Sequence, residues 1–225
     1  MTSAELHQPS SGAVPARGGR RARPRLARLR LVRLHLASRR VPTALAMLAA
    51  CGVVLWAGLH WHWIRGSGPA AQHLPLAIEA GTAAVIAVTT ASPLSELERA
   101  TGRWLPCLRL AVCAALAGAA FGALAAGAAA EHLPGGNLDM LRNIAGLAGI
   151  GLLCAALLGG GLGWVGPMAY LVVAEYALDA AWTTPWMWPT RPPHDLGAAL
   201  CAALVFAAGT AVITIRGARN SAREQ

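Results

Sequence analysis

The chain has 225 residues, of which 56% are hydrophobic and only 13% are charged. An ordinary soluble domain carries about 25% charged residues, so the composition excludes a water-soluble globular protein. All 19 strongly basic residues are arginine, and the net charge is +9. Ten arginines precede Val41, and most of the others lie where apolar segments end. This distribution is typical of membrane topology signals and lipid contacts, and it disfavours nucleic-acid binding.

Residues 1–40 are predicted to be a disordered, arginine-rich cytoplasmic tail. Residues 1–24 are rich in Ser, Gly, Pro, Ala and Arg and cannot bury a core. Residues 25–40 have leucines at near-helical spacing with arginines between them. They form either an amphipathic helix on an anionic inner leaflet or a solvated tail that only fixes orientation. Anionic lipid is the expected partner of these arginines, and no nucleic acid is expected.

Residues 41–216 are predicted to form an all-α, polytopic membrane domain. A hydrocarbon core about 30 Å thick needs about 20 apolar residues in helical conformation, and about six segments approach this length. The predicted spans are residues 42–64, 74–91, 105–130, 140–158, 165–181 and 196–215. Residues 217–225 would follow as a short cytoplasmic tail.

The arginines also predict the orientation of the spans. With the N-terminus inside, 16 arginines lie in cytoplasmic segments and 3 on the opposite side, as the positive-inside rule requires. Six spans then place both termini in the cytoplasm. The same orientation puts five tryptophans at the outer interface, where such rings are enriched: Trp61, Trp63, Trp182, Trp186 and Trp188.

Four ionisable residues within or beside the spans form a candidate polar pathway. Glu79 lies about one turn into the second span, and Arg142 opens the fourth. Glu175 lies inside the fifth span, with Asp179 four residues further on the same helical face. Ionisable groups inside a membrane are costly and are functional candidates by default. We expect Arg142 to pair with Glu175 or Glu79. These residues either lock the helix packing, through an ion pair or a protonated carboxyl, or line a substrate path.

The polar segment between the second and third spans predicts a short cytoplasmic surface helix. Ser95 and Glu98 have the spacing of a capping box, so a helix from about residue 96 to residue 102 is expected. This helix is either a docking element for a cytosolic partner or a solvated turn. It would carry four charged residues outward: Glu96, Glu98, Arg99 and Arg103.

Six spans with both ends inside, and a charged cytoplasmic helix between spans two and three, resemble the ABC-2 type of ABC transporter permease. The stretch Ser95-Glu96-Leu97-Glu98, followed by Arg103 to Arg109, is similar to the corresponding loop of that family. The resemblance implies a plasma-membrane permease subunit that exports a small hydrophobic, peptide or drug-like compound. It also implies a homo- or heterodimer of permease subunits, and coupling through this loop to a cytosolic ATP-binding subunit.

The sequence agrees with the separate ATPase, because it contains no G-x-x-x-x-G-K-[ST] phosphate loop. A non-catalytic membrane anchor or sensor subunit remains an alternative. An intramembrane enzyme is disfavoured, because no Ser–His pair, no HExxH motif and no histidine in the middle of a predicted span is present.

No metal or cofactor is expected. His60, His62 and His73 border the tryptophan belt, so interfacial packing is the preferred interpretation. Two glycine patterns predict close helix packing rather than nucleotide binding: Gly146-x-x-Gly149-x-Gly151 and Gly118-x-x-x-Gly122.

Overall fold

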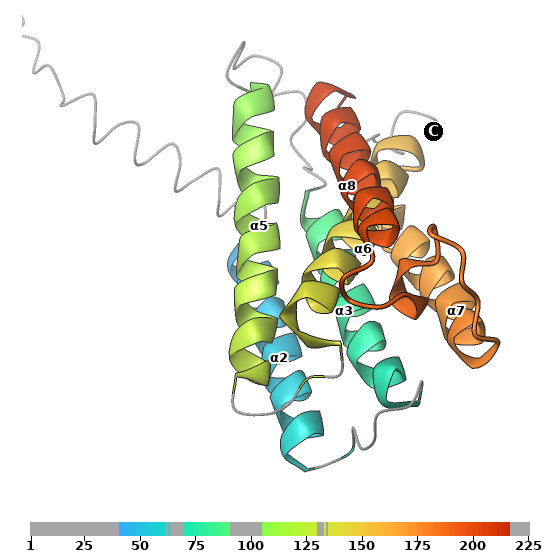
Figure 1. The fold of residues 1–225 in the computed structure, drawn as a ribbon. Helices are drawn as coiled ribbons and strands as arrows, with labels where there is room; N and C mark the ends of the chain where they lie inside the picture. Colours follow the sequence, from blue (N-terminus) through green and yellow to red (C-terminus); the bar gives the residue numbers. More distant parts are fainter. Residues whose placement is uncertain are drawn as a thin grey trace, which may run out of the picture. The chain divides into compact units, whose positions relative to one another are not determined.

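The computed structural model describes residues 41–61, 63, 70–90, 105–129, 133 and 135–216. These residues form six α-helices and no strand, which confirms the all-α class (Figure 1). Each predicted span corresponds to one helix. The helices are α2 (Val41–His60), α3 (Ala70–Thr89), α5 (Leu105–Ala128), α6 (Gly136–Leu157), α7 (Val165–Asp179) and α8 (Leu196–Arg216), with the 3-10 turns η2 (Gly160–Leu162) and η3 (Trp188–Thr190).

Five of these helices are long and apolar enough to cross a membrane, namely α2, α3, α5, α6 and α8. The most apolar window of α8 has a mean hydropathy of 2.3, yet only 22% of that window is buried inside the bundle. Such a surface is stable only against lipid or another apolar helix. The chain is therefore a multi-pass membrane protein.

The helix α7 is shorter than a full span. Its 15 residues make a helix about 22 Å long, against a hydrocarbon core of about 30 Å. It ends where Ala181 adopts a left-handed conformation with φ of 52°, and the Trp182 N–H donates to the Ala177 carbonyl oxygen at 3.0 Å. This is the bond that closes a Schellman-type helix end. Residues 180–195, which we call the tryptophan loop, continue from this point.

The helix α6 is the most enclosed of the spanning helices, with 67% of its apolar window buried. It packs against α3, α7 and α8 (Figure 1). A Cβ atom added to Gly149 would lie 2.6 Å from the backbone of Phe206 in α8, and one added to Gly151 would lie 2.7 Å from the Ala87 side chain in α3. The predicted packing role of these glycines is confirmed, because only glycine permits such close approach.

The glycines of α5 behave differently from the prediction. A Cβ atom on Gly52 of α2 would lie 2.5 Å from the Ala123 carbonyl oxygen, so α2 and α5 approach closely near Gly127. No atom lies within 4 Å of a Cβ placed on Gly118 or Gly122. Residues 118 and 127 are nine apart, or two and a half helical turns, so they lie on opposite faces. Within the described chain, Gly118-x-x-x-Gly122 makes no close helix contact, so its predicted pairing role stays a prediction.

Three predicted segments lie outside the described residues. They are the arginine-rich tail over residues 1–40, the charged loop with Glu96, Glu98, Arg99 and Arg103, and the C-terminal residues 217–225. Their assignments stay predictions from the sequence.

Candidate functional site

Four polar residues are enclosed between α3 and α6, and we call them the buried polar cluster: Glu79, Asp139, Arg142 and Asn143. Three of them are 5% exposed, and Asp139 is 7% exposed. Residues 139, 142 and 143 are spaced at i, i+3 and i+4, which places them on one face of α6. That face meets α3, the helix that carries Glu79. The spanning helices therefore enclose polar and ionisable side chains that would be energetically costly in contact with lipid.

The Arg142 guanidinium joins α6 to the tryptophan loop. It pairs with the carboxylate of Asp139, one turn earlier on the same helix. It also donates to the carbonyl oxygens of Pro192 at 2.8 Å and Arg191 at 3.0 Å. The predicted ion pair with Glu175 or Glu79 is wrong, because Asp139 lies on the same helical face and reaches the guanidinium first.

The Glu79 carboxylate has a different partner. Its side chain is hydrogen-bonded to the amide of Asn143. The second carboxylate oxygen, Oε2, is buried and has no hydrogen-bond partner among the described residues, and the same is true of Asn143 Oδ1. Buried polar atoms are nearly always paired, so these two oxygens call for an explanation, such as a bound water molecule, ion or proton.

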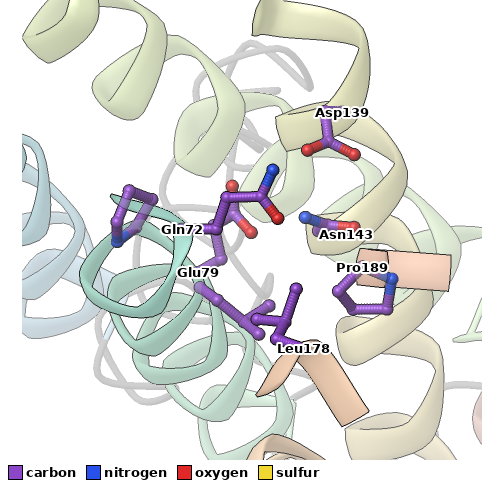
Figure 2. A pocket seen from close by; sticks show the side chains of 8 residues that line it. Gln72, Glu79, Asp139, Asn143, Leu178 and Pro189 are labelled. Carbon is purple, nitrogen blue, oxygen red and sulfur yellow. The ribbon is translucent and has the colours of Figure 1, made fainter. Parts of the chain in front are cut away.

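A small cavity lies beside these oxygens. Figure 2 shows Glu79, Asn143 and Gln72 turned toward the same space, with Leu178 and Pro189 at its edge. The cavity volume is about 10 Å³, which is room for about one water molecule. The complete lining comes from α3, α6, α7 and η3: Gln72, Pro75, Leu76, Glu79, Asp139, Asn143, Leu178 and Pro189.

Trp188 lies inside the bundle, so its predicted place at the outer interface is wrong. The indole is 2% exposed and stacks on the ring of Tyr170 at a centroid distance of 4.6 Å. A Cβ atom on Gly146 would lie 2.6 Å from Trp188 Cε2. The missing side chain at Gly146 therefore makes the space that the indole fills. By contrast, Trp61, Trp63 and Trp186 are exposed.

The tryptophan loop satisfies several of its own backbone oxygens, which allows it to fold against α6. The Thr190 hydroxyl donates to the Trp182 carbonyl oxygen at 2.6 Å. Arg191 Nη1 donates to the Thr183 carbonyl oxygen at 2.9 Å, and the Tyr170 hydroxyl to that of Trp186 at 2.9 Å. These bonds supply partners for backbone oxygens that regular secondary structure would otherwise satisfy.

A second polar contact joins α3 to α7. His73 Nδ1 contacts the Glu175 carboxylate, and His73 Nε2 lies 3.4 Å from Asp179 Oδ1. The prediction that Glu175 and Asp179 share a helical face is confirmed, but their common partner is His73. The prediction that spans lack histidine is wrong, because the span of α3 includes His73 and the span of α2 ends at His60.

Asp195 holds the other end of the tryptophan loop at the start of α8. The backbone N–H of Ala198 donates to Asp195 Oδ1 at 2.9 Å, and Arg191 Nε donates to Oδ2 at 2.8 Å. The Ala198 N–H, followed by the Arg191 guanidinium, lowers the pKa of Asp195 below its usual value. The residue is an N-cap, as aspartate often is.

The lowered pKa of Asp195 predicts an acid-sensitive contribution to stability. The contribution is present above the unfolded pKa of about 4 and is lost as the pH falls through the lower folded value. We expect the thermal midpoint of the wild type to fall more steeply below about pH 4 than that of Asp195→Asn, which cannot titrate. Thermal unfolding of both proteins across this range measures the difference. Parallel curves would contradict the assignment.

No known protein family, curated protein or solved structure matches this sequence. In the described part of the chain, no group of three His, Cys, Asp or Glu residues is placed to hold a metal ion. The site is therefore described from the structure alone. It contains the buried ion pair of Asp139 and Arg142. Beside the pair, Glu79 and Asn143 each have an unpartnered oxygen at a cavity with room for about one water molecule.

Proposed function

We propose that this chain is the permease subunit of an ABC-type transporter, exporting a small hydrophobic, peptide or drug-like compound across the plasma membrane. The observation that carries the proposal is the buried polar cluster with its cavity, inside a bundle of spanning helices. Intramembrane ionisable groups that face a bundle interior mark substrate and ion pathways in membrane proteins.

The arrangement of contacts supports a bundle that can open at this place. The cavity is lined by α3, α6, α7 and η3, and two polar contacts hold these elements together. One is His73 with Glu175, between α3 and α7. The other is Arg142 with the tryptophan loop. Both are hydrogen-bonded contacts that can break and reform, as alternating access requires.

The energy for transport would come from a separate ATP-binding subunit. The charged segment that precedes α5 carries Arg99 and Arg103, which the positive-inside rule assigns to the inner side, so an ATPase would meet it in the cytoplasm. We assign the docking contact to Glu96, Glu98, Arg99 and Arg103, with Glu98 and Arg99 as its centre. The assignment rests on the resemblance of this segment to the ABC-2 permease loop.

The transporter would contain a second permease subunit, identical or different. Supporting this, α5 carries a row of small exposed residues at helical spacing, opposite the face that meets α2. Small residues let two helices approach closely in a membrane. The row consists of Ala111, Ala115, Gly118, Gly122 and Ala126.

The test is co-purification of the tagged full-length chain with an ATP-binding protein from its host membrane, identified by mass spectrometry. We expect Glu98→Lys to abolish retention of the ATPase, because the reversed charge would repel its docking partner. Glu131→Lys is the matched control, since the sequence places Glu131 on the opposite side of the membrane, and it should retain the ATPase. Unchanged retention in Glu98→Lys would refute the docking assignment. A wild-type chain that retains no ATPase would instead favour the anchor or sensor subunit.

A further inference from the structure

We propose that the cavity beside Glu79 is a proton-binding site, in which Glu79 takes up one exchangeable proton and Asn143 is its hydrogen-bond partner. The inference rests on the buried geometry alone. It therefore holds or fails separately from ATP-driven transport.

The charge balance of the buried polar cluster requires one more positive charge. Asp139 and Arg142 form an ion pair and neutralise each other. Glu79 forms no ion pair in the part of the chain that the structure describes, and the fields of Asp139 and Arg142 act on it with opposite signs. With every group ionised, the cluster thus has a net charge of −1 in a place where isolated charge is strongly disfavoured.

The buried polar cluster has fewer hydrogen-bond donors than it needs: of its three unpartnered buried atoms, two oxygens are acceptors and only Arg142 Nε is a donor. An ionised carboxylate only accepts hydrogen bonds, and so does an amide oxygen. Glu79 Oε2 and Asn143 Oδ1 are two buried acceptors without donors among the described residues. A proton on Oε2 turns that oxygen into a donor. It can then bond to an acceptor of the cluster directly, or through the one water molecule for which the cavity has room.

A proton fits this site better than a metal ion. Hard cations such as Mg²⁺ and Ca²⁺ require about six to eight oxygen ligands, and the cavity offers two unpartnered buried oxygens. The guanidinium of Arg142 belongs to the same cluster, with its Nε also unpartnered, and would repel a metal ion. A proton needs no coordination shell.

The proton can enter from the outer end of α3. Gln72, near the start of α3, lines the cavity with Glu79 (Figure 2). The two residues are seven apart in the helix, which corresponds to about 10 Å. A hydronium ion that reaches the cavity gives its proton to Glu79 Oε2, forms the O–H bond there, and leaves as water.

The test is infrared spectroscopy of the full-length protein in lipid vesicles at neutral pH. We expect a carbonyl band of a protonated carboxylic acid, corresponding to one group per chain, that is lost in Glu79→Gln and kept in Asp195→Asn. Glutamine has the shape of glutamic acid and keeps the Asn143 contact. If Glu79→Gln fails to fold, ¹³C-labelled glutamate in the wild type must shift the same band.

Two results would overturn the proposal. One is that the wild-type spectrum lacks this carbonyl band. The same conclusion follows if the band is also present in Glu79→Gln, or if labelled glutamate does not shift it. The other is a band present in choline chloride but lost in sodium chloride of equal ionic strength, which would make the ligand a sodium ion.

Discussion

Arg142→Met is expected to lower the free energy of unfolding by about 3–5 kcal/mol, because it breaks a buried ion pair by removing one partner. The change leaves the Asp139 carboxylate buried without its cation. It also removes the donors to the carbonyl oxygens of Pro192 and Arg191. The tryptophan loop would then lose its attachment to α6, and Trp188 would become more accessible to quenchers.

Thermal unfolding in detergent, with quenching of tryptophan fluorescence, measures both effects. Arg216→Met is the matched control, because Arg216 is exposed in the last turn of α8. A surface substitution of this kind changes stability by less than about 0.5 kcal/mol. If the Arg142 and Arg216 variants unfold at the same temperature, Arg142 does not hold the loop.

Gly149→Ala is expected to lower the free energy of unfolding by about 1–3 kcal/mol, the usual range for overpacking. The new methyl group would lie 2.6 Å from Phe206 Cα and N, which are backbone atoms and cannot rotate away. The contact is reciprocal, because a Cβ atom on Gly209 of α8 would overlap the carbonyl oxygen of Gly149. The two helices would have to separate along their closest contact.

Gly81→Ala is the matched control for this prediction. No atom lies within 4 Å of a Cβ placed on Gly81, so alanine enters open space there. It should be neutral, or stabilising by up to about 1 kcal/mol through its better helix propensity. Equal midpoints for the Gly149 and Gly81 variants in thermal unfolding would mean that α6 and α8 are not in close contact at Gly149.

The positions of the helices could be predicted because apolar length alone decides which segments cross a membrane. The start of α5, of α7 and of α8 was predicted at the residue where the structure has it. The end of α7 was not, because alanine is a good helix former and nothing marks Ala181 as a residue that will adopt a left-handed conformation.

The partners within the site could not be predicted, because apolar patterns do not determine which helices become neighbours. His73 was assigned to a loop, so its contact with Glu175 was missed. Asp139 and Asn143 were also missed, although Arg142 and Asn143 follow Asp139 at i+3 and i+4, which was a usable signal. Pro189 reaches the cavity only because Gly146 leaves room for Trp188 beside it, a fit that depends on three-dimensional packing.

The shortness of α7 has a consequence for the surrounding lipid. Its 15 residues leave about 8 Å of a hydrocarbon layer about 30 Å thick uncovered at this edge, and the bilayer adapts to such a short helix by becoming thinner. Val172 and Tyr176 of α7 are exposed. The acyl chains beside α7 therefore contact a shorter apolar surface than the acyl chains beside α8. This edge should thus attract shorter or more disordered lipids, which makes it the place where the bilayer is easiest to deform.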